Sequence, residues 1–424
     1  MIQEFSAENI YSIRERQTLS FVASKDTSSQ ELLTHEIKPN LRLLKLVILY
    51  GANASGKTNL LFAMQQLWQL LFFPKLSKEE PITYAPFLLD RNSSNKPIVL
   101  SAIFYINTIK YQYSITYNQQ HIISEELKYA PNGILSKFYT RTISDQQGTP
   151  KIEFGDTLAL SAKAKNILEA NTLHNHTVLS TFAKVTVEAA PFMVIYQWLK
   201  NTVHSVVEPQ RLVEIAKSVL SDDRKKRFFL NAIKKADFNI SNLSIVEENN
   251  ELPQSIIEAI SKNDLISPKD KERLLSGKKE NVQFSHTTEN GEFPLDKELQ
   301  SLGTLQYFTL LDKLYDMING NHIYMIDEVE DQLHYDLLIY FLSSFLLNSN
   351  EAQLIVTTHN QQLLVEDFIR RDMVWFAEKN RQSAASEFYS AADFGLHKNI
   401  SLYNAYRSGR LGAKPSTGSI ILED

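Results

Sequence analysis

The chain has 424 residues, 43% of them hydrophobic and 22% charged, so it is long enough to bury a large core and has the composition of a globular protein. The net charge of −5 excludes a globally basic nucleic-acid coat but not a local basic patch, and the absence of cysteine excludes disulfides, Cys-ligated zinc and a thiol nucleophile. With no apolar stretch near ~20 residues and no basic signal-peptide region in MIQEFSAEN, we expect a cytoplasmic protein without a membrane partner.

Residues 1–155 are predicted to form a buried strand, a helix and an antiparallel sheet. The run LLKLVILYG at 43–51 is apolar except for Lys45, which is typical of a strand buried on both faces of a parallel or mixed sheet. Apolar residues follow a helical period over 59–73, and residues 98–129 contain three segments rich in β-branched and aromatic residues. We therefore expect one half of an α/β domain, with a small antiparallel β-subdomain beside its main sheet.

Residues 156–280 differ in composition, because strong β patterns become rare while Ala, Lys, Leu and Asn increase. Helices are predicted at 161–170, 191–206, 209–236 and 253–276. No heptad pattern is sustained, so this segment is expected to be a compact helical insertion and not a long coiled coil.

Residues 281–424 return to an alternation of strands and helices. Strands are predicted at 281–287, 322–328, 352–359, 373–379 and 387–391. Helices are predicted at 304–317, at 333–348 and from Asn360 onward. This alternation is typical of an α/β sheet with helices on its faces, and we interpret these residues as the second half of the domain begun by residues 1–155.

The segment GANASGKT at 51–58 matches the phosphate-loop pattern G-x-x-x-x-G-K-[ST], and it lies between a predicted strand and a predicted helix. Gly51 and Gly56 allow the backbone amides to point at phosphate oxygens, Lys57 would reach the β- and γ-phosphates of ATP, and the Thr58 hydroxyl would bind Mg²⁺. The alternative is an accidental glycine-rich turn, which the strand–loop–helix context disfavours. Further nucleotide contacts are expected at Asn53, Ser55 and Asn59.

The segment IYMIDE at 323–328 places two carboxylates after four apolar residues, at the carboxyl end of a predicted buried strand. Asp327 is expected to hold Mg²⁺, directly or through water, and Glu328 to orient or deprotonate the attacking water. Alone, the pattern also fits a strand followed by an acidic turn. Its pairing with the phosphate loop favours a nucleotide site.

Two weaker elements complete the pattern. In LQSLGT, Ser301 and Gly303 begin a predicted helix and could offer a hydroxyl and backbone amides to a phosphate, although Ser-Leu-Gly is also an ordinary helix cap. In IVTTHN, His359 ends a predicted strand and could contact the γ-phosphate; the alternative is a capping or core-edge histidine.

The order of these four elements resembles the ABC ATPase superfamily. More closely, the chain is similar to the bacterial AAA-type ABC ATPases that include RloA, the AbiL ATPase subunit and the OLD-family ATPase domain. The resemblance covers roughly residues 1–130 and 282–415 and rests on ENIYSIRERQTLSF, GANASGKTNLL, FSH, LQSLGTLQ, IDEVEDQLH, TTHNQQLL, WFAEK and YRSGRLGAKP. It implies an ABC-type P-loop ATPase head, split by the insertion. The chain departs from the family at Gln300 and Leu302, where acidic residues are common.

The resemblance also implies partners. ATP would be bound between Lys57 of one subunit and Ser301 of another, in a homodimer or a higher assembly. The family implies an ATPase that senses infection and regulates an effector in anti-phage defence, with a nucleic acid or a phage protein as the trigger. Few residues follow His359, so a Toprim-like nuclease effector is expected on a separate polypeptide.

The sequence leaves two alternative functions to consider. An SMC-like DNA-maintenance ATPase acting directly on DNA is suggested by the basic stretch at 224–227 with Lys234 and Lys235, although such stretches are more often solvated helix faces. The missing coiled coil and the missing CxxC hook disfavour this reading. A transporter nucleotide subunit is disfavoured by the large insertion and by the C-terminal Tyr-x-x-Gly-Arg pattern.

Overall fold

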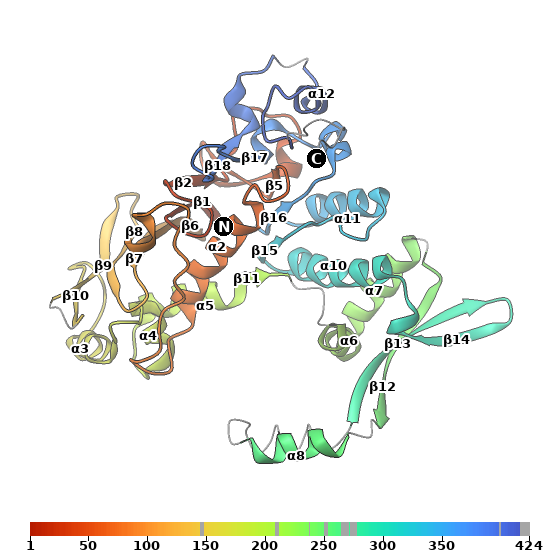
Figure 1. Ribbon diagram of the computed structural model, residues 1–424, viewed down its shortest axis with the longest axis horizontal. Coiled ribbons are helices and arrows are strands. Elements are labelled where there is room, and N and C mark those ends of the chain that lie inside the picture. Colours follow the sequence, from red (N-terminus) through yellow and green to blue (C-terminus); the bar gives the residue numbers. More distant parts are fainter. Residues whose placement is uncertain are drawn as a thin grey trace, which may run out of the picture. The chain divides into compact units, whose positions relative to one another are not determined.

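The computed structural model describes residues 1–144, 148–207, 212–236, 238–249, 253–263, 271, 278–397 and 400–415 (Figure 1). Contacts divide the chain into two compact units, which are described separately. The first unit comprises Met1–Val207, Met317–Glu330 and Ser343–Asp424, and the second comprises Glu208–Asp316 and Asp331–Leu342. Within the described ranges, no helix is long and apolar enough to cross a membrane.

The main sheet of the first unit has six strands. Their order is β11 (Val203–Val206), β15 (Ile323–Ile326), β16 (Gln353–Thr357), β5 (Leu46–Tyr50), β17 (Val374–Lys379) and β18 (Ser386–Ser390). Neighbouring strands from β11 to β17 are parallel, and β18 is antiparallel to β17, so the sheet is mixed as predicted. Every residue of β5, β15 and β16 is buried, which is why these strands are continuous apolar runs.

The second sheet of the first unit is antiparallel and has seven strands, which include the three predicted over 98–129. Their order is β10 (Pro150–Phe154), β9 (Ser136–Ile143), β8 (Ile122–Ala130), β7 (Ile109–Tyr117), β6 (Ile98–Ile106), β1 (Ile2–Glu8) and β2 (Gln17–Ser20). The first strand, β1, joins the predicted meander by pairing with β6. The fold is therefore α/β, with a mixed sheet and an antiparallel β-subdomain.

Helix α2 (Lys57–Phe72) leaves the main sheet directly after β5 and the predicted phosphate loop. It packs against β1, β11, α4 (Val178–Lys184) and α5 (Ala190–Thr202). The remaining elements of the unit are α1 (Gln30–Leu33), β3 (Thr34–Lys38), β4 (Leu41–Leu44), α3 (Ala162–Asn171) and α12 (Leu402–Arg407). The predicted strand at 43–51 is thus two strands, β4 and β5, which are separated at Lys45.

The second unit contains α6 (Leu212–Ser221), α7 (Asp223–Lys235) and α8 (Gln254–Lys262), with the antiparallel strands β12 (Ile240–Asn249), β13 (Lys278–Thr288) and β14 (Gly291–Asp296). Its core includes Phe229 and Phe284, whose rings meet that of Phe308 edge to face with centroids 5.0 and 5.4 Å away. Helices α10 (Leu302–Asn319) and α11 (Tyr335–Asn348) begin in this unit and end in the first.

Several predicted helices differ in the structure. The helix expected over 191–206 ends at Thr202, because the β-branched segment from Val203 pairs with β15 as the edge strand β11. The helix expected over 209–236 is interrupted at Asp222, whose carboxylate caps α7 by accepting from the backbone amide of Arg224 at 2.8 Å. Of the helix expected over 253–276, α8 is present, and the segments 264–270 and 272–277 lie outside the described residues.

Two further differences concern the ends of the predicted pattern. Strand β12 was not predicted, although it pairs along most of its length with β13. The helix expected to begin near Asn360 is a 3-10 helix, Gln361–Val365, and a second 3-10 helix follows at Arg371–Met373.

Candidate functional site

The predicted phosphate loop, Gly51–Thr58, follows β5 at the carboxyl end of the main sheet, between β16 and β17. Gly56 has φ 106°, and a Cβ there would collide with Ser386 and would lie 2.7 Å from Ser12 Oγ. Ser386 Oγ lies 2.7 Å from Ser12 Oγ and 2.7 Å from the carbonyl oxygen of Ser55. These two serines, which the sequence analysis missed, therefore support the loop from distant parts of the chain.

Lys57, the first residue of α2, is 5% exposed. Its Nζ lies 2.9 Å from the carbonyl oxygen of Gly51, 3.2 Å from that of Ala52 and 3.2 Å from Nε2 of His359. Burial lowers the pKa of Lys57, and the carboxylates within 327–330 oppose this effect by favouring its charge. The ammonium group is therefore held by neutral acceptors and has no direct carboxylate partner in these contacts.

Asp327 follows β15 and is fixed by two hydroxyl groups. Its Oδ2 accepts a hydrogen bond from Thr58 Oγ1 at 2.8 Å, and its Oδ1 accepts one from Thr357 Oγ1 at 2.5 Å. The same Thr357 oxygen accepts the backbone amide of Glu328 at 2.8 Å. Thr357, at the end of β16, therefore holds the carboxylate of Asp327 and the backbone of Glu328, although the sequence pattern did not single it out.

Glu328 points out of the sheet edge with a side chain that is 58% exposed. Its backbone is in the left-handed region with φ 46°, a conformation that a non-glycine residue adopts at a cost and that is frequent at functional sites. Its Oε1 lies 3.7 Å from Nε2 of His359. The backbone amide of His359 donates to Oε1 of Glu330 at 2.5 Å, so a third carboxylate that was not predicted anchors the end of β16.

These groups line one cavity of about 300 Å³, called here the loop cavity. Its walls are formed by Ser12, Asn53, Ala54, Ser55, Gly56, Lys57, Thr58, Asn59, Glu328, His359 and Lys379. The predicted loop residues, the predicted base and the predicted histidine thus meet in one place. Gly51 lies in the wall of a neighbouring cavity of about 530 Å³, and Asp327 reaches the site through Thr58.

The groups present suit a magnesium nucleotide. Ser55 Oγ is buried and has no hydrogen-bond partner among the described residues, so it is available to a phosphate oxygen. Thr58 and Asp327 offer the hydroxyl and carboxylate oxygens that Mg²⁺ prefers. No cluster of three or more His, Asp or Glu side chains within the described ranges could hold a metal ion, so Mg²⁺ would need phosphate and water ligands as well.

Ser301 and Gly303 belong to the second unit. The hydroxyl of Ser301 accepts the backbone amide of Thr304 at 3.0 Å and lies 2.7 Å from the Thr304 hydroxyl, which caps α10. Gly303 lies in the first turn of the same helix. The role expected for this pair in binding a phosphate stays a prediction.

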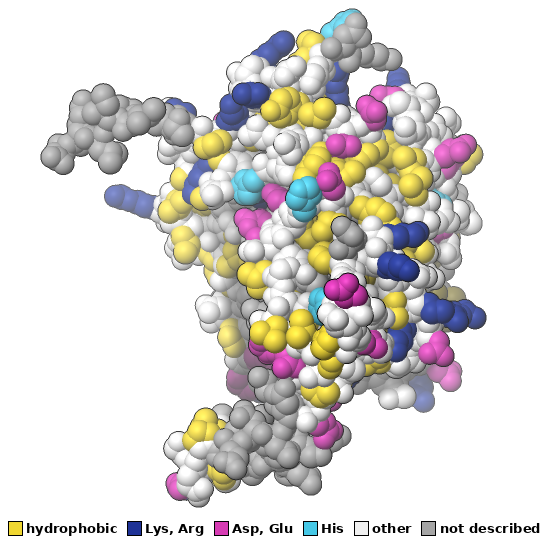
Figure 2. Space-filling view, turned by 90° about the vertical axis from the view of Figure 1, so that its right-hand side faces the viewer, with side chains coloured by type: hydrophobic (Ala, Val, Ile, Leu, Met, Phe, Trp, Pro, Cys, Tyr) yellow, Lys and Arg dark blue, Asp and Glu magenta, His cyan; other side chains and the backbone are white. Residues whose placement is uncertain are grey.

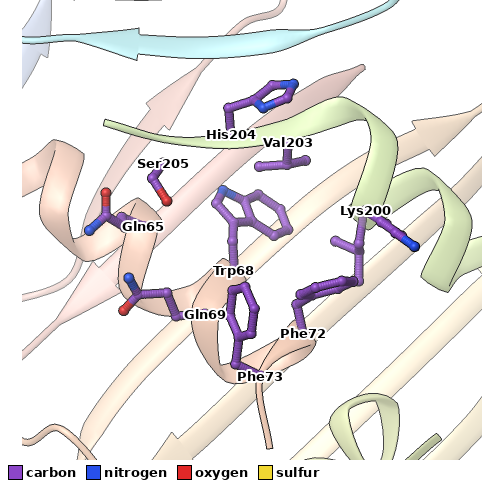
Figure 3. Close-up of a pocket in the computed structure, with 10 residues that line it drawn as sticks. Gln65, Trp68, Gln69, Phe72, Phe73, Lys200, Val203, His204 and Ser205 are labelled. Carbon is purple, nitrogen blue, oxygen red and sulfur yellow. The ribbon is translucent and has the colours of Figure 1, made fainter. Parts of the chain in front are cut away.

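Another cavity, of about 260 Å³, lies between α2, α5 and β11 and differs in chemistry from the loop cavity (Figure 3). Figure 3 shows the indole of Trp68 at its centre, with Phe72 and Phe73 below and Val203 above. Lys200 is the one basic side chain in this wall apart from His204. Aromatic rings line much of this cavity, and Ser205 supplies the one hydroxyl among its lining residues, so it offers a phosphate fewer donors than the loop cavity does.

The basic stretch at 224–227 forms the first turns of α7. Lys225 is 6% exposed, and its Nζ lies 2.6 Å from Oδ1 of Asp312 and 3.5 Å from Oδ1 of Asp316. One of the four cations is therefore committed to an internal ion pair. On the face shown in Figure 2, Lys and Arg side chains are scattered among acidic and hydrophobic ones.

A comparison with protein-family models matches residues 46–366 to the family described as "AAA domain, putative AbiEii toxin, Type IV TA system". No curated protein matches the chain.

Similar solved structures include the SMC head domain from Thermotoga maritima, at 12% identity and a TM-score of 0.40, covering 92% of this chain and 98% of that one. They also include an Smc head bound to the C-winged helix domain of ScpA, at 13% identity and a TM-score of 0.41, covering 95% and 99%. A third is the Smc head with an extended coiled coil bound to the C-terminal domain of ScpA, derived from Pyrococcus furiosus, at 12% and 0.39, covering 96% and 98%. We draw the family from the model match, which spans most of the chain: this protein belongs to that AAA-type ATPase family.

Proposed function

We propose that this chain binds Mg²⁺-ATP in the loop cavity and hydrolyses it to ADP and phosphate. The observation that carries the proposal is the convergence of Lys57, Thr58, Asp327, Glu328 and His359, from three segments of the chain, on one sheet edge. These are the residue types that phosphoryl transfer to water requires: a cation, a hydroxyl and a carboxylate for Mg²⁺, a base and a polar group near the γ-phosphate.

Each side chain has one role in this proposal. Lys57 exchanges its carbonyl partners for phosphate oxygens. Glu328 accepts a proton from the water whose oxygen attacks the γ-phosphorus, while the bond from phosphorus to the bridging oxygen breaks and ADP leaves. His359 orients the water or the γ-phosphate. Mg²⁺ supplies neutralisation of phosphate charge when bound, and Thr58 and Asp327 would be its protein ligands.

We further propose that two copies share each nucleotide, with Ser301 and Gly303 of one copy closing on the γ-phosphate bound by the other. The chain would then act as the sensor and regulator of a separate effector, a Toprim-like nuclease, in a bacterial anti-phage defence system. The support is the resemblance to RloA-like and AbiL-like ATPases, together with the toxin and antitoxin terms in the description of the matched family. In this proposal the ATP state sets the conformation that holds or releases the effector.

The test has two parts. The purified chain is assayed for phosphate release from ATP with and without Mg²⁺, and turnover that requires Mg²⁺ is expected. The chain is then co-expressed with the product of the neighbouring gene and purified by a tag on the ATPase. Recovery of a complex, with loss of phage resistance when either gene is deleted, supports the regulatory role; no complex and no phage phenotype would refute it.

A further inference from the structure

The C-terminal segment 402–415 carries the YRSGRLGAKP motif that the nucleotide chemistry leaves unexplained. In the structure it forms one wall of the 530 Å³ cavity next to the loop cavity. The same cavity is also lined by the start of the phosphate loop, Gly51–Asn53, and by His359. Resting on the proposed function, we infer that this segment belongs to the ATPase site and that Tyr50 and Tyr406 are positioning residues for the phosphate loop and for His359.

Tyr406 fixes the residue from which the phosphate loop starts. Tyr50 is the last residue of β5 and directly precedes Gly51, and its ring is buried against two others. The centroid of the Tyr50 ring lies 5.9 Å from that of Tyr406 and 6.2 Å from that of Phe376. Tyr406 and Phe376 stack on each other at 5.2 Å. Loss of the Tyr406 ring would therefore remove one of the two rings against which Tyr50 packs.

Tyr50 also connects the start of the phosphate loop to the segment after β16 that contains His359. Its hydroxyl donates to the carbonyl oxygen of Asn360 at 3.1 Å, one residue beyond His359. His359 Nε2 in turn lies 3.2 Å from Lys57 Nζ and 3.7 Å from Glu328 Oε1. A small shift of the chain at 359–360 would thus change the distances from the imidazole to both groups.

The C-terminal segment fits its place closely. The hydroxyl of Tyr406 donates to the carbonyl oxygen of Ala413 at 3.2 Å, which closes the loop after α12. Gly412 has φ 64°, and a Cβ there would lie 2.5 Å from the Tyr389 hydroxyl oxygen and 2.7 Å from Oε2 of Glu378. The backbone at Gly412 therefore lies close against Tyr389 and Glu378 and leaves no room for a larger side chain.

The experiment measures kcat for ATP and the Kd of ATP for the full chain carrying Tyr50→Phe, His359→Ala or both. Tyr50→Phe keeps the ring and removes one hydrogen bond, so we expect kcat to fall about threefold to tenfold with Kd changed by less than about twofold. Because the bond acts through His359, the double variant should be no slower than His359→Ala alone. Tyr406→Ala should lower kcat at least as much as Tyr50→Phe, and Tyr406→Phe should restore most of it.

The matched control is Tyr111→Phe, a buried tyrosine of the antiparallel sheet that packs on Phe104, and it should retain the wild-type kcat. Effects of Tyr50→Phe and His359→Ala that multiply would overturn the inference, as would a kcat for Tyr50→Phe equal to that of the wild type. Failure of the proposed function looks different: the wild-type chain itself would show no turnover, and Lys57→Ala would not change its ATP binding.

Discussion

Two buried lysines, one in each unit, have ammonium groups with opposite kinds of partner. Lys57 and Lys225 are almost equally buried, but their partners differ. Lys225 is neutralised by the carboxylate of Asp312 at 2.6 Å. Burial raises the pKa of that carboxyl, but the ammonium groups of Lys313 and Lys225 lower it more, so its net shift is downward. Lys57 contacts two carbonyl oxygens and an imidazole, and burial lowers its pKa.

From this difference we propose that Lys225 is a structural cation and that Lys57 binds an anionic ligand. A buried ammonium group that is already paired with carboxylates of the protein gains little from binding an anionic ligand. A buried charge that only neutral groups hold is costly to the empty protein, and an anionic ligand relieves that cost. The contrast predicts opposite consequences when each lysine is removed.

The largest effect is expected for Lys225→Ala, which leaves Asp312 buried without its cation. The free energy of unfolding should fall by about 3–5 kcal/mol. Chemical denaturation measured by circular dichroism checks this value. Lys225→Met combined with Asp312→Leu should recover a large part of the loss. A loss under about 1 kcal/mol for Lys225→Ala would show that the ion pair with Asp312 does little to stabilise the fold.

Lys57→Ala should weaken ATP binding on the order of 100-fold, because the variant loses charge-assisted hydrogen bonds to phosphate. The free energy of unfolding of the nucleotide-free protein should not decrease. Isothermal titration calorimetry and denaturation of the same preparation measure both quantities. Lys225→Ala is the matched control, with unchanged ATP affinity in its folded fraction. Wild-type affinity of Lys57→Ala for ATP would show that Lys57 does not bind the nucleotide.

Thr357→Val tests the hydroxyl that holds the Asp327 carboxylate and the Glu328 backbone. The change keeps the shape of the side chain but removes the donor to Asp327 and the acceptor of the Glu328 amide. We expect kcat to fall about tenfold, since Asp327 loses a donor and the backbone amide of Glu328 loses its acceptor. Thr309→Val, which removes a buried hydroxyl bonded within α10, is the matched control and should leave kcat unchanged. Equal rates for the two variants would exclude this role.

The smallest effect is a pH dependence at a third buried lysine. Lys45 Nζ donates to the carbonyl oxygens of Leu346 and Ser349 at 2.7 and 2.8 Å, and burial lowers its pKa to about 8. Above that pH the folded chain loses a proton that the unfolded chain keeps up to its ordinary pKa of 10.5, so the stability of the wild type should rise relative to Lys45→Met between these values. Urea denaturation at pH 7, 8 and 9 measures the difference. A difference that does not change with pH would contradict the shift.

Much of the site was predictable because its residues follow apolar runs. Buried parallel strands are continuous runs of apolar residues, so the sequence predicts where β5, β15 and β16 end. The residues that follow these ends are the phosphate loop, Asp327 and His359. Carboxyl ends of parallel strands meet at one sheet edge, which explains why the predicted groups lie together.

The groups that hold the site in place were not predictable in this way. Ser12, Ser386 and Thr357 are single hydroxyl residues whose roles depend on contacts between distant segments. Strand β11 has only four residues and follows α5 directly. Its residues are too few to show a strand pattern of their own, so the predicted helix extended over them. The limits proposed for the two halves and the insertion, at 155 and 280, stay predictions.

The central claim is that Glu328 is the base of an ATPase site built around Lys57. Glu328→Gln tests it most directly, because the amide keeps the size of the side chain and cannot accept the proton. We expect wild-type ATP affinity by calorimetry and a kcat reduced by at least about 100-fold. We also expect a dimer or a higher assembly trapped with ATP, measured by light scattering. Hydrolysis by Glu328→Gln at the wild-type rate would show that Glu328 is not the base.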